Sequence, residues 1–281
     1  GNMSPRFQTT EAGQADLSVL LRYEKPIADL RERLREADTL HGRHSGTLTD
    51  RFMDEAQTAG HRPYFIAGAH ISGGLEHFDA LWKLIVGNDG LSPRAPYSLM
   101  RPILEHGFWA QYVLDSDQSV VRRLRGINAE ARDRRQRKAW TDVYDLSKES
   151  TAAYQRRHEE ILGIYRQEAA ELGASGLDRT KPDMTVEIPK LRAVSEHGPD
   201  VATLCVGAWR LLSGVTHGSL FAVQVMSDID ERHRVERGEE VRVSINDEWF
   251  VMSVRASLIM LVDAMRLYIA RTTQVNRRVS P

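Results

Sequence analysis

Residues 209–218 read Trp-Arg-Leu-Leu-Ser-Gly-Val-Thr-His-Gly and lie within an apolar run that extends from about 201 to 226. Inside that run, Arg210, Ser213 and His217 are polar side chains that structural packing alone does not require. Ser213 and His217 are four residues apart and so share one face of a helix, and Arg210 lies two turns before His217. The spacing predicts a helix that presents one polar site to a groove.

Apolar residues recur at helical spacing on both sides of this stretch, whereas residues 173–189 form a linker-like stretch with two glycines, two prolines and few apolar residues. An alternating pattern around Gly238 predicts a small β-hairpin or extended arm over 232–246. The periodicity predicts helices over the ranges 16–38, 64–86, 97–114, 120–172 and 248–273.

These elements predict an all-α fold, a multi-helix bundle with few strands. We expect a disordered N-terminus over 1–15, because these residues are polar, and a single domain over 16–275. A long helical excursion at about 116–172 and the small hairpin complete the expected architecture.

Composition and charge narrow the classes of function. The chain has 281 residues and a net charge of −1, so no global field directs it to nucleic acid or to a membrane. The single cysteine, Cys205, excludes an internal disulfide and a zinc site built from cysteines, and a cytoplasmic setting is the simplest expectation. The most apolar window, 249–269, contains Arg255, Asp263 and Arg266, which argues against a membrane-spanning helix.

The arginine and histidine of 209–218 resemble the motif of the HEPN superfamily, a group of helical proteins. Many members are metal-independent ribonucleases or toxins, and others are non-catalytic. The polar residue that often follows the arginine in that motif is replaced by Leu211. The resemblance implies contact with RNA or a nucleotide, a defence or toxin role, and a homodimer across which the site is composed.

A second resemblance, to uncharacterised helical proteins of high-GC bacteria, rests on residues 99–109 and 209–218, with Glu76-His77 upstream. It pairs an Arg-x-x-x-Glu helix with a Ser-x-x-x-His-Gly helix. The two resemblances together imply one site in which His217 is the general base and an arginine stabilises charge on the phosphate. The candidate catalytic residues are His217, Arg210, Ser213, Glu105 and Arg101. Taken alone, Arg101 and Glu105 also fit a structural i,i+4 salt bridge.

A basic run between residues 122 and 138 holds eight arginines and lysines against two acidic residues. Such a helix can follow a phosphate backbone, although a basic run is more often a solvated face. The candidate nucleic-acid-binding residues are Arg122, Arg123, Arg125, Arg132, Arg134 and Arg135.

Two other functions fit the same residues. The first is a non-catalytic binding protein, in which the polar group sits in an aromatic pocket formed by Trp82, Trp109, Tyr112 and Trp209. The second is a metal-dependent oxidase with ligands from Glu76-His77 and Glu105-His106. Neighbouring residues on a helix point about 100° apart, and no convincing pair of Glu-x-x-His motifs is present, so we expect no metal and no cofactor.

Overall fold

The computed structural model describes residues 11–43, 48–86, 94–143, 148–235 and 238–275. Most of the expected disordered N-terminus (1–10) and the tip of the expected hairpin (236–237) lie outside these described residues. Within them the fold is mostly helical, which confirms the predicted all-α class, and no helix is long and apolar enough to cross a membrane.

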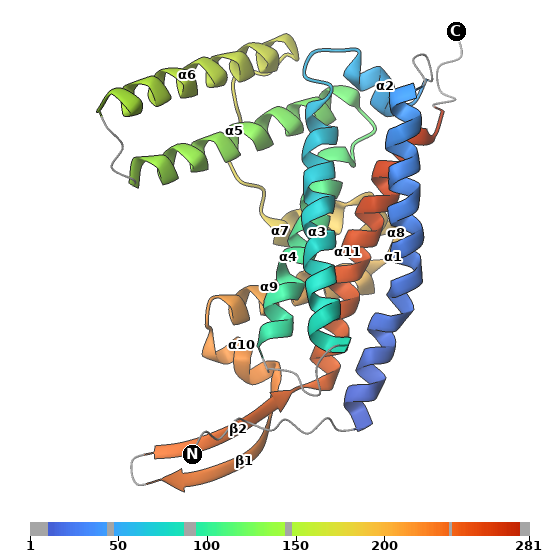
Figure 1. Cartoon of the computed structure of the whole chain (residues 1–281), viewed down its shortest axis with the longest axis vertical. Coiled ribbons are helices and arrows are strands. Elements are labelled where there is room, and N and C mark those ends of the chain that lie inside the picture. Colours follow the sequence, from blue (N-terminus) through green and yellow to red (C-terminus); the bar gives the residue numbers. More distant parts are fainter. Residues whose placement is uncertain (1–10, 44–47, 87–93, 144–147, 236–237, 276–281) are drawn as a thin grey trace. The chain divides into compact units, whose positions relative to one another are not determined.

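The elements in chain order are shown in Figure 1. They are α1 (Glu11–Arg43), α2 (Asp50–Glu55), α3 (Arg62–Val86), α4 (Ala95–Leu114), α5 (Ser119–Val143), α6 (Lys148–Glu171), α7 (Met184–Glu187), the 3-10 helix η1 (Ile188–Lys190), α8 (Arg192–His197), α9 (Pro199–Thr216), α10 (Leu220–Val225), β1 (Ser227–Val235), β2 (Gly238–Ile245) and α11 (Asp247–Thr273). The expected excursion thus corresponds to α5 and α6, and the expected linker contains α7 and most of η1.

The chain divides into two compact units, whereas the sequence suggested one domain over 16–275. The unit boundaries fall inside α1, α3, α4 and α11, so each of these helices contributes residues to both units. The first unit comprises Gly1–Arg33, His70–Trp109 and Met184–Arg266, and the second comprises Leu34–Ala69, Ala110–Asp183 and Leu267–Pro281.

The core of the first unit lies between α4 and α11. Tyr97, Ile103 and Phe108 on α4 and Phe250 and Leu258 on α11 are almost completely buried. Buried residues recur every three or four positions along both helices and so form a continuous apolar face, as the periodicity predicts: Tyr97, Met100, Leu104 and Phe108 on α4, and Phe250, Val254, Leu258 and Leu261 on α11. Burial of such large side chains is the main driving force for this packing.

The hairpin of the first unit consists of β1 and β2, which pair antiparallel with Ser227 opposite Ile245 and Val235 opposite Gly238. The register shifts between Ile229 and Glu231, as at a β-bulge. The pairing begins earlier in the chain than the sequence pattern indicated, at 227 rather than 232.

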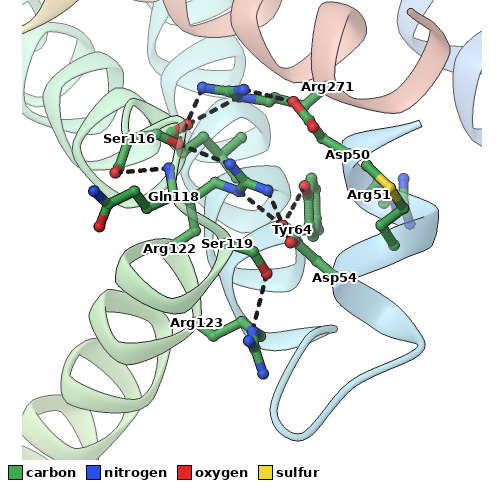
Figure 2. Close-up of polar contacts among 12 residues, drawn as sticks. Asp50, Arg51, Asp54, Tyr64, Ser116, Gln118, Ser119, Arg122, Arg123 and Arg271 are labelled. Carbon is green, nitrogen blue, oxygen red and sulfur yellow. Dashed lines mark hydrogen bonds and ion pairs between the residues drawn. The ribbon is translucent and has the colours of Figure 1, made fainter. Parts of the chain in front are cut away.

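The second unit contains a buried polar network, shown in Figure 2. Asp54 on α2 is fully buried, and its two carboxylate oxygens accept hydrogen bonds from Nε and Nη2 of Arg122 at 2.7 and 2.8 Å. The hydroxyl of Tyr64 donates to the same carboxylate at 2.8 Å. Nη1 of Arg122 donates to the carbonyl oxygens of Ser116 and Asp117, just before α5. Every charged group at the centre of this network is therefore paired, as buried charges require.

Arginines also connect the other helices of this unit. Arg62 on α3 forms an ion pair with Glu168 on α6, at 2.7 Å, and with Glu130 on α5. Its guanidinium lies over the ring of Tyr165, 4.7 Å from the ring centre. Arg271 near the end of α11 pairs with Asp50 and donates to backbone carbonyls of residues 114–116. These contacts hold the loop before α5 and the facing sides of α5 and α6 in place.

Candidate functional site

The predicted catalytic residues lie on α4 and at the C-terminal part of α9 in the first unit. Helix α9 ends at Thr216, and His217 is its exposed C-cap residue, whose backbone N–H still donates to the Ser213 carbonyl oxygen at 3.0 Å. Gly218 adopts a positive φ of 73°, and the next residue donates a backbone hydrogen bond to the Gly214 carbonyl oxygen at 2.8 Å. This is the usual way in which a glycine ends a helix. His217 therefore lies one helical turn after Ser213, at the end of the helix.

Arg101 and Glu105 do meet, as an ion pair of 3.1 Å on α4. The Arg101 guanidinium lies 5.3 Å from the ring centre of Trp209, so this part of α4 reaches α9. Arg210 is exposed and lines an open groove of about 760 Å³ together with Pro189 and Pro199. The structural salt bridge is thus the role that the contacts of Arg101 and Glu105 support.

The basic run falls into two parts. Arg122 and Arg123 are 1% and 7% exposed and serve the network of the second unit, where Arg123 donates to Ser119 Oγ and to the Thr58 carbonyl oxygen. Arg125 donates to the carbonyl oxygen of Tyr112 at 2.7 Å. These three arginines are internal hydrogen-bond donors, so the expectation that they bind nucleic acid is corrected: their guanidinium groups are used within the fold.

The later arginines are more accessible. Arg132 and Arg134 are half-buried, with Arg134 over the ring of Tyr154 at 5.7 Å. Arg135 lies near two exposed arginines, Arg166 and Arg179. Its pKa is lowered, first by burial and then by the charges of these two neighbours. Arg135, Arg166 and Arg179 form what we call the arginine patch of the second unit. Like charges held close together are favourable sites for an anion.

A cavity of about 570 Å³ in the first unit combines charge with titratable groups. We call it the arginine-lined cavity. Residues of α1 line one side of it at positions 19, 22, 23 and 26, and residues of α11 line the other at 251, 255, 259, 262, 263 and 266. Both series follow helical spacing, so each helix turns one face toward the cavity. Its polar lining residues are Arg22, Tyr23, His197, Arg255, Asp263 and Arg266.

The chemical centre of this cavity is a histidine–aspartate pair. Nε2 of His197, the last residue of α8, lies 2.8 Å from Oδ2 of Asp263. Asp263 is 5% exposed, whereas the side chain of His197 is 39% exposed. Because a carboxylate accepts the hydrogen bond, the proton is held on Nε2 and Nδ1 is left as the basic nitrogen. Burial raises the pKa of Asp263, while the hydrogen bond and charge of His197 and the charge of Arg266 lower it in part.

No family model, curated protein or solved structure matches this chain.

Positively charged side chains outnumber negatively charged ones around the His197–Asp263 pair. Arg22, Arg255 and Arg266 line the cavity against a single carboxylate, and all three are exposed. Only Arg266 approaches Asp263, at 3.8 Å. The cavity therefore carries an excess of positive charge over an apolar floor, an arrangement suited to an organic anion.

Two neighbouring groups are poor nucleophiles. Burial raises the pKa of the Cys205 thiol to about 12, and the charge of Asp263 acts in the same direction. Burial also raises the pKa of the Tyr23 hydroxyl, with Arg255 opposing it. Both groups stay protonated at neutral pH, and a thiol is reactive only as the thiolate. The imidazole Nδ1 of His197 is therefore the atom of this cavity that we consider as a proton acceptor.

The alternative metal site does not assemble. In the described part of the chain, no group of three or more His, Cys, Asp or Glu residues is arranged to hold a metal ion. Nδ1 of His77 is hydrogen-bonded to the Gly73 carbonyl oxygen at 2.8 Å, and Nδ1 of His106 lies 2.9 Å from Nδ1 of His70. The residues Glu76, His77, Glu105 and His106 thus give the oxidase interpretation no ligand set.

The sequence of α11 carries one signal for the arginine-lined cavity. Arg255, Asp263 and Arg266 interrupt an apolar helix at spacings of eight and three residues. Such charges argue against a membrane span, and charges within a buried helix also indicate a site. His197 immediately before a Gly-Pro pair gave no comparable signal.

Proposed function

We propose that the arginine-lined cavity binds a phosphate-bearing ligand, RNA or a nucleotide, and that the protein cleaves RNA without a metal ion. The observation that carries this proposal is the His197–Asp263 pair, held 2.8 Å apart in a cavity lined by three arginines. The proposal keeps the metal-independent ribonuclease class suggested by the HEPN-like motif and moves the general base from His217 to His197.

The reaction follows from the groups in the cavity. Nδ1 of His197 accepts the proton of a ribose 2′-hydroxyl, whose oxygen then attacks the adjacent phosphorus. The bond from phosphorus to the 5′-oxygen breaks, and that oxygen takes a proton from water. The products are a 2′,3′-cyclic phosphate and a 5′-hydroxyl end, and His197 returns its proton to solvent. Arg22, Arg255 and Arg266 stabilise the negative charge that develops on the phosphate oxygens.

Asp263 has a positioning role in this mechanism. Its carboxylate fixes the imidazole so that Nδ1 is the accepting nitrogen, and it stabilises the imidazolium that forms. HEPN-like membership, a homodimer and a defence or toxin role belong to the same proposal. The motif at 209–218 is their only support.

The test is cleavage of mixed single-stranded and structured RNA in the presence of a chelator. His197→Ala is expected to lower the rate by at least about a hundredfold, the usual contribution of a general base. Asp263→Asn is expected to lower the rate and to change its pH profile, because the amide orients the ring but does not stabilise its charge.

His217→Ala is the matched control, since His217 is an exposed histidine of the same unit. Its rate should equal that of the wild type. Loss of cutting in His217→Ala but not in His197→Ala would return the base to His217. Nucleotide binding in the cavity without any cutting would favour the non-catalytic binding protein instead.

The arginine patch of the second unit favours a separate contribution to RNA binding. Replacing Arg135, Arg166 and Arg179 together with glutamine should weaken binding of single-stranded RNA by a similar factor for every sequence. The slope of log affinity against log salt should become shallower by about 2, close to 0.7 for each lost phosphate contact. Arg137→Gln, an exposed arginine of α5, serves as the control. An unchanged slope in the triple variant would remove the patch from the RNA-binding surface.

A further inference from the structure

A second, smaller cavity of the first unit lies between α9 and α11 and has a volume of about 230 Å³. We call it the tryptophan-walled cavity. Its lining positions on α9 are 200, 203, 204, 207 and 208, and those on α11 are 249, 252 and 253. Both sets follow the i, i+3, i+4 pattern of a single helix face. The lining consists of Asp200, Thr203, Leu204, Gly207, Ala208, Trp249, Met252 and Ser253, so none of the groups proposed for RNA cleavage belongs to it.

The cavity contains a buried hydroxyl with no partner in the described structure. Ser253 is 1% exposed, and its Oγ makes no hydrogen bond to any described residue. Buried polar atoms are almost always paired, and an unpaired hydroxyl lowers the stability of the protein. A molecule that enters the cavity and hydrogen-bonds to this hydroxyl would remove the cost of leaving it unpaired. The orphan hydroxyl therefore points to an occupant with a hydrogen-bonding group.

The rest of the lining restricts the chemistry of that occupant. Trp249, Met252 and Leu204 provide apolar walls, and Asp200 is the one charged residue among the lining positions. Asp200 is exposed, so its carboxylate is available to a ligand. A tryptophan face and a carboxylate both attract a cation. An apolar cavity of about 150 Å³ holds benzene, so 230 Å³ leaves room for one ring and a short polar arm.

We propose that the tryptophan-walled cavity binds a compact aromatic amine. The ring lies against Trp249 and Met252, and the ammonium group donates hydrogen bonds to Ser253 Oγ and to the Asp200 carboxylate. This site is independent of the arginine-lined cavity, which selects the opposite charge.

Three probes of nearly equal size and different charge test the proposal: 2-phenylethylamine, 2-phenylethanol and phenylacetate. Binding is measured by calorimetry and by saturation-transfer NMR on the full chain. We expect the amine to bind about tenfold more tightly than the alcohol. The reason is that a partly desolvated ion pair contributes about as much binding free energy as one hydrogen bond to a charged group. The acid should bind most weakly.

Two variants separate the contributions of the lining residues. Ser253→Ala should weaken binding of the amine by about fivefold or more and, in the same protein, raise the midpoint of thermal unfolding by about one to a few degrees. A serine with only a structural role would not produce these two changes together. Asp200→Asn should abolish the preference for the amine over the alcohol.

The control variant is His197→Ala, which alters the arginine-lined cavity and should leave binding of the amine unchanged. Three results would overturn the proposal: no probe binds, the acid binds as tightly as the amine, or Ser253→Ala binds the amine like the wild type. The first of these would mean that only water enters the cavity. Each result is distinguishable from failure of the ribonuclease proposal, which is measured on RNA and on other residues.

Discussion

Arg122→Ala is expected to lower the free energy of unfolding by about 3–5 kcal/mol, because it leaves a buried carboxylate without its cation. Asp54 is fully buried, and both of its oxygens accept hydrogen bonds from Arg122. The substitution also removes the donors to the carbonyl oxygens of Ser116 and Asp117. Tyr64 would remain as a hydrogen-bond donor to Asp54, which cannot compensate for the lost charge.

Urea unfolding at neutral pH measures this effect, with Arg137→Ala as the control. Arg137 belongs to the same basic run but is 60% exposed, so its replacement should change stability by less than about 0.5 kcal/mol. The double variant Asp54→Leu with Arg122→Met should recover much of the loss, since an apolar pair of similar volume avoids the unpaired charge. A loss below about 1 kcal/mol in Arg122→Ala would show that the pair contributes little to the fold.

The contrast between Arg122 and Arg137 explains why the sequence alone did not show which arginines of the basic run are buried. The partner of Arg122 lies 68 residues away along the chain, and no local spacing reveals such a pair. A weaker signal was present, because Arg123, Ile127 and Ala131 repeat every four residues and mark a buried face. The number of charges alone does not distinguish one arginine of the run from another. Helical spacing does, because it separates arginines on the buried face of α5 from those on its accessible face.

Periodicity was sufficient for the fold class because each long helix buries an apolar face that recurs every three to four residues. It was not sufficient for the site. Ser213 and His217 lie one turn apart at the end of α9, where Gly218 terminates the helix and His217 is exposed to solvent. A glycine directly after the last apolar residue of a helix is often its terminator.

The His197–Asp263 pair illustrates the other limit. The two residues are 66 positions apart and come from a short helix and a long one, so their contact depends on how the helices of the first unit pack. Sequence patterns define the faces of helices but not which faces meet. Asp263 interrupts the apolar stretch of α11 in the sequence, but only the packing shows that His197 contacts it.

The stability of the protein is expected to fall by about 3 kcal/mol between pH 6.5 and pH 4 on account of a single histidine of the first unit. Nδ1 of His70 on α3 lies 2.9 Å from Nδ1 of His106 on α4, and the ring of Trp109 stacks on His70. Only one proton fits between the two nitrogen atoms, so the pair cannot hold a full charge on both rings. The missing Cβ of Gly73 leaves the space that the His106 ring occupies.

The titratable surroundings give the direction of this effect. Burial, together with the smaller effect of the charge of His106, lowers the pKa of His70 to about 4. Burial and His77 lower the pKa of His106, whereas Glu105 and Glu76 raise it. An unfolded histidine titrates near 6.5, so below that pH the unfolded chain binds a proton that folded His70 does not. Stability is therefore complete above about pH 6.5 and is lost as the pH falls toward 4. A shift of about 2.5 pKa units corresponds to about 3 kcal/mol.

His70→Gln removes the titration and keeps a side chain that can hydrogen-bond to His106. The free energy of unfolding of the wild type minus that of this variant should decrease by about 3 kcal/mol from pH 7 to pH 4. Carboxylates also titrate in this range, but they do so in both proteins and cancel in the difference. His217→Gln, at an exposed position, should follow the wild-type curve throughout. Parallel curves for the wild type and His70→Gln would mean that His70 is protonated in the folded protein, with its bond to His106 rearranged.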